Sequence, residues 1–287
     1  MAGTCIRRAS TFFLGVSSYN VLSAVPNERF RLIHSTLGTP VVCLQGTRRK
    51  APDSLPCSVM HTAGYRVYQF GYGPKSNAHA GVSIALKHKK FSEDTVVLVD
   101  APRDPKLQGR AGLVRVKSGS ADFAILSVYL PPCFADNSIR RVWHSVMQWV
   151  SKSLDKLPSR CLPILCLDAN SRVGKVACAR GVAIDTSDAV GQCEPELETP
   201  AGHAFKTFLE GQFMSGANTY FSAGKTFYPT SLASKPSRVD YGCLPGSAVE
   251  ASRVSSCLVN EEAGDCLQLI RGHARADHRP LQMHLDV

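Results

Sequence analysis

Carboxylate, amide and imidazole side chains recur in three short motifs in the second half of the chain. Asp168 and Asn170 follow directly on an apolar run, Asp240 precedes a tyrosine, and Asp277 and His278 close the series. Carboxylate and amide oxygens bind hard cations such as Mg²⁺, and an imidazole can hold a phosphate while water attacks it. Together these motifs predict a site for metal-assisted phosphoester chemistry.

Six apolar runs of strand length could position these groups, at residues 12–16, 41–44, 82–86, 95–99, 123–130 and 162–167. Most are apolar throughout, which is typical of strands covered on both faces. Between them, apolar residues recur at helical spacing in three sets: Phe30, Ile33 and Leu37; Ile139, Val142, Trp143, Val146 and Val150; and Phe205, Phe208 and Leu209. Pro26 and Gly38 bound the first expected helix, and Asp136 or Asn137 caps the second.

Strands mixed with helices predict a single layered α/β domain, since no internal repeat or long linker divides the 287 residues. We expect this domain to span residues 12–287 behind a short leader at 1–11, with loops around 52–56, 102–108 and 191–202. The apolar start superficially resembles a signal peptide. Cleavage there would detach Asn20 from an intact strand, so a first core strand is the preferred interpretation.

The formal net charge of +10 favours a polyanionic partner, with nucleic acid ahead of membrane surfaces. Basic residues gather at 48–50, 87–90 and 140–141 and at Arg172, Lys175 and Arg180. Any single cluster is also typical of a solvated loop, so the prediction of a polyanionic partner rests on the overall excess of basic over acidic residues. No apolar run approaches the roughly 20 residues that a membrane-spanning helix needs.

Cysteine usage points to a reducing, intracellular compartment. The eleven cysteines include no C-x-x-C pair. Cys43, Cys161 and Cys166 lie in apolar runs, where a free thiol acts as a small hydrophobe. We therefore expect neither a disulfide framework nor structural zinc, and a nuclear or cytoplasmic location.

Six motifs in a fixed order resemble the endonuclease/exonuclease/phosphatase superfamily of metal-dependent phosphodiesterases. They lie at residues 18–21, 42–45, 127–132, 168–170, 238–241 and 277–280, and the resemblance runs from about Phe12 to the last residue. Segments 191–221 and 226–241 look like the retroelement-type endonuclease domains within that superfamily. The resemblance implies a four-layer α/β sandwich, in which two packed mixed β-sheets are flanked by helices and the site lies on loops at one edge.

The resemblance also implies roles for the phosphate-handling residues. His278 would lie against the scissile phosphate, with Asp240 fixing its tautomer or its protonation. Asp168 would orient or deprotonate the attacking water. Asn170 and the hydroxyl of Tyr129 would contact phosphate oxygens. Taken singly, Tyr129 also fits a core aromatic, Asn170 a turn, and Asp240 a surface ion pair with Arg238.

The implied metal is Mg²⁺ or Mn²⁺, with Asp277, Asp168 and Asn20 as ligands or positioning groups. The family's principal metal ligand is a glutamate after leucine and glutamine. Here Gly46 takes that position. Glu28 and Glu93 are conceivable substitutes, although nothing in the sequence places either at the site; Gly46 could also admit a water or a backbone carbonyl.

Milder departures are Leu167 before Asp168, where glycine is usual, and Ala276 before Asp277, where serine is usual. The leading hypothesis is a monomeric, metal-dependent endonuclease that acts on DNA rather than RNA. The loss of the carboxylate at Gly46 favours a second hypothesis, a nucleic-acid-binding protein that retains the fold without cutting. A third is a phosphoinositide or sphingolipid phosphoesterase.

Overall fold

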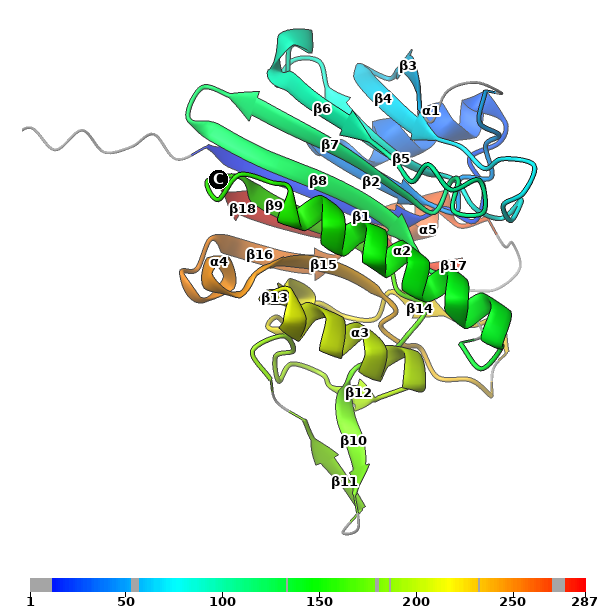
Figure 1. The fold of residues 1–287 in the computed structure, drawn as a ribbon, viewed down its shortest axis with the longest axis vertical. Coiled ribbons are helices and arrows are strands. Elements are labelled where there is room, and N and C mark those ends of the chain that lie inside the picture. Colours follow the sequence, from blue (N-terminus) through cyan, green and yellow to red (C-terminus); the bar gives the residue numbers. More distant parts are fainter. Residues whose placement is uncertain are drawn as a thin grey trace, which may run out of the picture.

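Two large β-sheets form the centre of the protein in a computed structural model that describes residues 12–52, 57–132, 134–178, 181–185, 187–231, 233–269 and 277–287. The seven-stranded sheet has the order β16 (Val254–Val259), β18 (Leu281–Asp286), β1 (Phe13–Asn20), β2 (Val41–Gln45), β5 (Val82–Lys87), β4 (Tyr65–Phe70) and β3 (Ser58–Thr62). The six-stranded sheet has the order β13 (Met214–Gly216), β15 (Asp240–Pro245), β9 (Leu162–Asp168), β8 (Ala121–Tyr129), β7 (Ala111–Ser118) and β6 (Val96–Asp100). Figure 1 shows the two sheets packed against each other.

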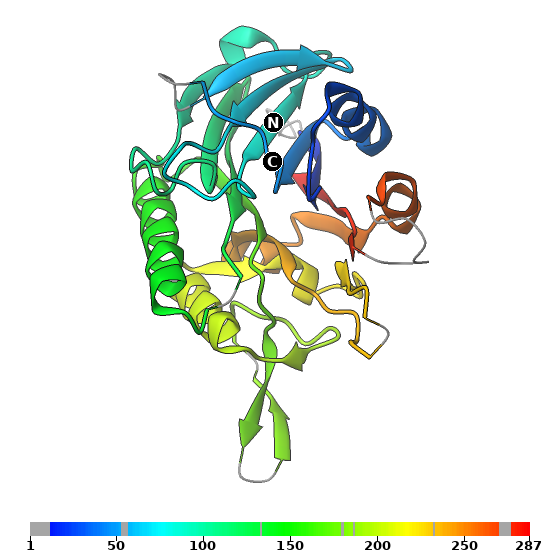
Figure 2. The ribbon, with the colours of Figure 1, turned by 90° about the vertical axis from the view of Figure 1, so that its right-hand side faces the viewer.

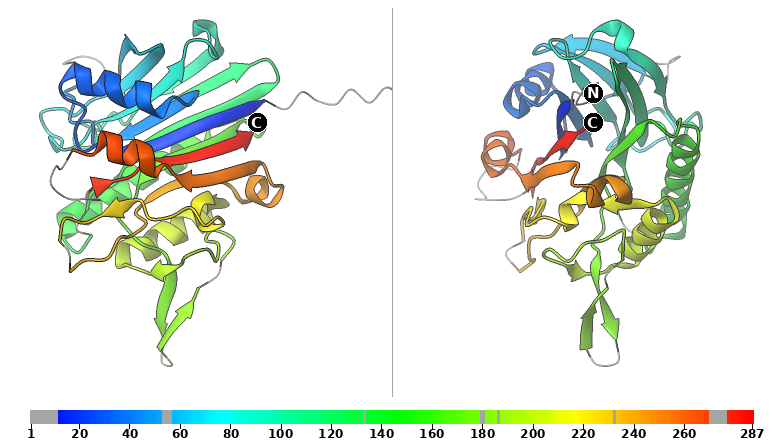
Figure 3. Two further views of the ribbon diagram at one scale, coloured as in Figure 1. Left: turned by 180° about the vertical axis from the view of Figure 1, so that it is seen from behind. Right: turned by 90° about the vertical axis from the view of Figure 1, so that its left-hand side faces the viewer.

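Both sheets are mixed. β1 pairs parallel to β2 and antiparallel to β18, while β9 pairs parallel to β8 and antiparallel to β15. β1 and β18 lie side by side although they come from opposite ends of the described chain (Figure 3). The apolar residues between the sheets form one core cluster, with Val16 and Ile84 from one sheet and Ile125 and Ile164 from the other.

Helices cover the outer faces. α1 (Asn27–Leu37) and α5 (Glu261–Leu267) pack on the seven-stranded sheet, and α2 (Asn137–Asp155) and α3 (Pro200–Gly211) pack on the six-stranded sheet. A short helix, α4 (Gly246–Glu250), follows β15. The order helix, sheet, sheet, helix confirms the predicted four-layer sandwich.

The expected helix signals operate as predicted. Gly38 ends α1 with φ +66°, and the Asp136 side chain caps α2 by accepting from the backbone N–H groups of residues 138 and 139. Thr199 caps α3 through the N–H of Gly202. The apolar stripe of α2 is buried at Trp143 and at the valines that follow it.

One predicted strand differs in its surroundings. β6 lies at the edge of the six-stranded sheet, and its Val97, Leu98 and Val99 are 50%, 41% and 38% exposed. This run is therefore an exception to the expectation that most of the apolar runs are covered on both faces. The loop expected at 191–202 also contains a two-residue strand, β12 (Glu196–Leu197), and α3 already begins at Pro200.

A small third sheet joins β12 to a hairpin of β10 (Gly174–Cys178) and β11 (Gly181–Ile184). This hairpin projects well away from the sandwich (Figure 2). A two-stranded ribbon of β14 (Phe227–Tyr228) and β17 (Asp277–His278) lies at the site edge. Residues 1–11, the expected leader, lie outside the described ranges.

Nine cysteines lie in the described ranges, and all nine are free thiols. Cys43, Cys161 and Cys166 are buried, as expected. No helix in the described part of the chain is long and apolar enough to cross a bilayer.

Candidate active site

Three neighbouring strands align the acidic and phenolic groups. Tyr129 ends β8 directly opposite Asp168, which ends β9, and Asp168 in turn lies opposite Asp240 at the start of β15. The strand register alone therefore brings these three residues together from distant parts of the sequence.

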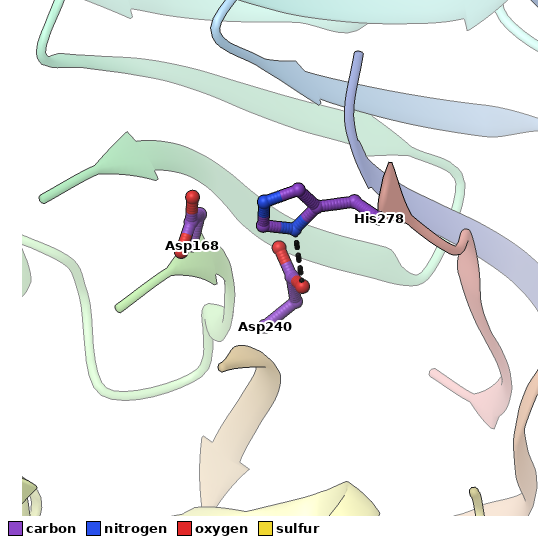
Figure 4. A group of neighbouring side chains, drawn as sticks. All are labelled: Asp168, Asp240 and His278. Atoms are coloured by element: carbon purple, nitrogen blue, oxygen red, sulfur yellow. Dashed lines mark hydrogen bonds and ion pairs between the residues drawn. The ribbon is translucent and has the colours of Figure 1, made fainter. Parts of the chain in front are cut away.

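His278 reaches the same place from the β14–β17 ribbon, where it pairs with Phe227. Its Nδ1 lies 2.9 Å from Oδ2 of Asp240, and both side chains are buried (Figure 4). One ligand atom from each of Asp168, Asp240 and His278 lies within 4.8 Å of the others. The expected partnership of His278 with Asp240 is present in the structure.

The electrostatics of this cluster favour a cationic imidazole beside acidic groups. Burial disfavours the imidazolium, but the charge and hydrogen bond of Asp240 outweigh that cost and raise the pKa of His278 to about 9. Burial and then the charge of Asp240 raise the pKa of the Asp168 carboxyl to about 7. At neutral pH the site thus holds a proton donor next to a carboxyl group poised to take up a proton.

Two asparagines surround Asp168. Asn20 Nδ2 donates to Asp168 Oδ2 over 2.7 Å and lies 3.2 Å from Nε2 of His278. Asn170 has φ +46° and donates its backbone N–H to Asp168 Oδ1 over 2.8 Å. Its side-chain Nδ2 donates to the carbonyl of Leu130 and to Asp168, so Asn170 both forms a turn and orients the carboxylate.

The contact between Asn20 and His278 depends on the charge of the ring. A neutral ring that carries its hydrogen on Nδ1 can accept from Asn20 at Nε2. A cationic ring has a hydrogen on Nε2 as well and can no longer accept there. It then requires an oxygen acceptor, and a phosphate oxygen is one.

Thr226 and Asn218 form hydrogen bonds with the backbone at Asp240. Neither was predicted as a site residue. Thr226 Oγ1 accepts the backbone N–H groups of both Val239 and Asp240, each over 3.0 Å. The carbonyl of Thr226 accepts the N–H of Arg279 over 2.7 Å, next to His278. Asn218 Nδ2 donates to the Asp240 carbonyl over 3.0 Å. Thr226 thus ties the strand of Asp240 to the segment of His278.

Tyr129 is half-buried at the rim of the cluster, and burial followed by the charge of Asp168 raises the pKa of its phenol. The Arg110 guanidinium lies over its ring, 5.0 Å from the centroid. Arg110 was not among the basic residues singled out from the sequence, where it appears as one arginine in a loop.

Asp277 occupies a different position from the other acids. Its φ is +97°, and its Oδ1 accepts the N–H of His278 over 2.7 Å. Burial raises the pKa of its carboxyl. It lies beside His278 but outside the group formed by Asp168, Asp240 and His278.

Gly46 lies against Asn20. Its φ is +62°, and a Cβ added to it would stand 2.5 Å from Oδ1 of Asn20. That oxygen accepts the N–H of Leu22 over 3.0 Å. The space that a side chain at position 46 would enter therefore contains the Asn20 amide.

The alternative of a surface pair between Asp240 and Arg238 is wrong. Asp240 is buried and bonds to His278, whereas the buried Arg238 donates to the carbonyl of Cys193 and pairs with Glu194. Of the possible substitutes for the missing carboxylate, Glu93 pairs with Arg66 on β4 at 3.5 Å.

A cavity of about 280 Å³ opens beside His278 and Asn170. Phe227 forms one wall, with its ring 4.9 Å from the imidazole, and Arg172 lies at the rim.

The donor set fits a hard divalent cation. Within the described ranges, no donor reaches Oδ1 of Asp240 or Oδ2 of Asp277, although both oxygens are buried. Buried carboxylate oxygens without donors are suited to a cation. The set is one carboxylate short at Gly46, and the amide oxygen of Asn20 already accepts from Leu22.

Comparisons with known proteins agree with this architecture. No protein-family model matches the chain, and a search of curated proteins found no match. Solved structures do match. An AP endonuclease from Leishmania major aligns over 96% of this chain and 88% of its own, with TM-score 0.64 and 14% identity.

Two further structures align over nearly their full length. The endonuclease domain of TRAS1, a telomere-specific non-LTR retrotransposon, has TM-score 0.59 and 15% identity, with 96% of this chain and 99% of that one covered. A 3'-5' exonuclease from Neisseria meningitidis has TM-score 0.59 and 14% identity, with 96% and 100% covered. The chain shares the fold of these nuclease structures, and this fold is the one that the six motifs predicted.

Proposed function

We propose that this protein is a divalent-metal-dependent phosphodiesterase that nicks DNA as a retroelement-type endonuclease. The observation that carries the proposal is the placement of His278, with Nδ1 on Asp240 and Nε2 facing the side chain that holds Asp168. Similarity to structures named as AP endonucleases, a retrotransposon endonuclease and an exonuclease supports it.

Asp168 is the proposed base. Asn20 and the backbone of Asn170 fix both of its carboxylate oxygens, and its raised pKa suits proton uptake near neutral pH. Water attacks phosphorus and gives one proton to Asp168, while the P–O bond to the leaving oxygen breaks and that oxygen takes up a proton from solvent water. The Asn20 amide keeps that carboxylate oriented toward the site.

His278 handles the phosphate. In its cationic form Nε2 donates to a non-bridging oxygen and stabilises the charge that accumulates there. Asp240 maintains that protonation through Nδ1, and the Tyr129 hydroxyl provides a further donor at the rim. A bound Mg²⁺ or Mn²⁺, held by Asp277 and Asp168 with help from Asn20, would neutralise charge on the phosphate and the leaving oxygen.

Plasmid nicking tests this proposal. Purified protein with Mg²⁺ or Mn²⁺ should convert supercoiled DNA to the open circle, and His278→Gln or Asp168→Asn should abolish the conversion. His79→Gln and Asp94→Asn, both exposed, are matched controls that should nick like the parent. If the two site variants nick as fast as these controls, the assignment of the site is wrong.

Gly46 supports a second candidate function, DNA binding without cleavage, because the family's glutamate is absent there. Its signature is salt-dependent DNA binding combined with no nicking under any divalent metal. We propose that under either function the protein binds nucleic acid in the nucleus or cytoplasm. We also propose that it acts as a monomer.

A further inference from the structure

Arg110 is a buried cation without an acidic partner. The residue is 4% exposed, and among the described residues no carboxylate lies within ion-pair distance of its guanidinium, although the charge of Asp168 acts on it from farther away. Among the described residues its side chain donates one hydrogen bond, from Nη1 to the carbonyl of Tyr129 over 3.4 Å. Burial of a guanidinium without a paired counter-ion is unfavourable unless an anion joins it. The burial of Arg110 therefore points to a ligand that brings negative charge.

Arg110 lines a cavity of about 330 Å³ at the start of α2. Lys75 and Lys106 also line it, and no acidic side chain does. Its remaining walls include Pro131 and Val142. Three cationic residues that line one cavity without an acidic residue give it a positive potential, which favours an anion there.

This cavity adjoins the proposed active site. The backbone carbonyl of Arg110 accepts the N–H of Tyr129 over 2.8 Å, and Tyr129 stands opposite Asp168 in the sheet. The Arg110 guanidinium stacks on the same tyrosine ring. Tyr129 therefore stands next to Asp168 in the sheet and contacts Arg110, which lines the cationic cavity.

Cationic side chains flank the site in both directions. Arg172 lies at the rim of the cavity beside His278, while Arg110, Lys75 and Lys106 lie beyond Tyr129. A single small phosphoester fills one of these cavities. A nucleic-acid strand carries a phosphate at every nucleotide and can occupy both.

We propose that the Lys75–Lys106–Arg110 cavity binds a second backbone phosphate of the DNA strand whose scissile phosphate lies at His278. The proposal rests on the proposed function for the identity of the strand. Arg110 presents a planar fork that matches two phosphate oxygens, and the two lysines add charge at the mouth. The cavity thereby selects a polymer over a small phosphoester.

Binding measurements in EDTA test the cavity without any need for cleavage. Fluorescence anisotropy of a labelled DNA oligonucleotide is measured over a salt series, for the parent and for Lys75→Ala/Lys106→Ala. The matched control is Lys117→Ala/Lys156→Ala, which removes two exposed lysines, one near the end of β7 and one at the C-terminal end of α2. The test variant should bind about tenfold more weakly, and its slope of log K against log salt should fall by about 2. The control variant should bind DNA as tightly as the parent and with the same salt slope.

Arg110 is tested through substrate choice. Arg110→Gln should raise KM for DNA by a larger factor than KM for bis(p-nitrophenyl) phosphate, a small chromogenic phosphodiester. Arg110→Lys keeps the charge and should restore part of the DNA affinity. Circular dichroism of both variants establishes that they fold.

The outcomes separate the two proposals. If the protein cleaves no phosphodiester but its salt slope for DNA binding still depends on the two lysines, the cavity proposal stands and the endonuclease proposal fails. The cavity proposal is overturned if the test and control variants bind DNA alike. It is also overturned if the test variant loses binding only to vesicles that contain phosphatidylinositol bisphosphate.

Discussion

The amide oxygen of Asn20 lies 2.5 Å from the point where a Cβ on Gly46 would stand. Loss of the family's glutamate has therefore not left an open gap beside the site. Asn20 fills the space while its Nδ2 holds Asp168, so glycine at 46 is a condition for the present arrangement.

Gly46→Ala should lower the nicking rate by displacing Asn20 from Asp168. The backbone strain of a side chain at positive φ, about 1–2 kcal/mol, adds a loss of stability. Gly119→Ala is the matched control, because Gly119 has φ +58° and no atom within 4 Å of its Cβ position. Thermal unfolding and plasmid nicking are measured for both. Equal activity in the two variants would contradict the role of this contact.

Gly46→Glu restores the family's carboxylate but must also move Asn20. We expect tighter Mn²⁺ binding without a matching gain in rate, since Asp168 loses a donor. Isothermal titration with Mn²⁺ beside a nicking assay separates the two effects. A full gain of nicking would show that the Asn20 contact is dispensable.

Asp240→Asn should reduce kcat by roughly 10²-fold or more, because the amide cannot maintain the His278 imidazolium as the carboxylate does. The protein should remain folded, since the hydrogen bonds from Thr226 and Asn218 involve only the backbone of residue 240. Single-turnover nicking provides the rate, and circular dichroism provides the fold. A loss smaller than threefold would remove Asp240 from the mechanism.

Thr226→Val should cost about 1–3 kcal/mol of stability by leaving two buried N–H groups without their acceptor. Because one of them belongs to Asp240, activity should fall even where the variant is fully folded. Thr226→Ser keeps the hydroxyl and should recover both properties. The comparison uses urea unfolding together with nicking at a temperature where all three proteins are folded.

His34 makes the folded protein sensitive to acid. It is buried in α1, and burial lowers the pKa of its imidazole to about 4, while an unfolded chain titrates near 6.5. Its contribution to stability is fully present above pH 6.5 and is lost as the pH falls toward 4. The loss is about 1.4 kcal/mol per pH unit. Urea unfolding from pH 7 to 4 should show a shallower decline for His34→Leu, and parallel curves would contradict the assignment.

Asp277→Asn tests the proposed metal ligand. Asparagine tolerates positive φ and can still accept the N–H of His278, so the fold should persist. The Mn²⁺ concentration for half-maximal nicking should rise about tenfold or more, by analogy with the loss of other supporting metal groups. Asp94→Asn, an exposed acid, should leave that concentration unchanged.

The sequence motifs revealed the polar side chains that meet in the candidate site. Asp168, Asp240 and His278 lie at strand ends in short motifs, and the register of β9 and β15 brings the two acids opposite each other. Thr226 and Arg110 were not predicted as site residues. Their relation to the site depends on a hydrogen bond to the backbone and on burial, and neither can be recognised from the residue type.

The strands likewise divide into those that could be predicted from the sequence and those that could not. Runs that are apolar throughout, such as β2 and β9, were predicted, because both of their faces are buried. β18 alternates between buried and half-exposed residues, and β3 pairs at an edge, so neither reads as a continuous apolar run. The sequence likewise showed that position 46 lacks a carboxylate, but the amide that fills the space comes from Asn20 on another strand.

The pairing of β1 with β18 also governs when the catalytic group is assembled. Of the described strands, β1 is synthesised first and β18 last. β1 therefore lacks its partner β18 until all the other described strands have been made. His278 lies just before β18 and takes its place only when that strand joins. Nascent chains therefore expose an incomplete sheet edge and lack the cluster of Asp168, Asp240 and His278, so closure of the sheet and assembly of this cluster occur in one step.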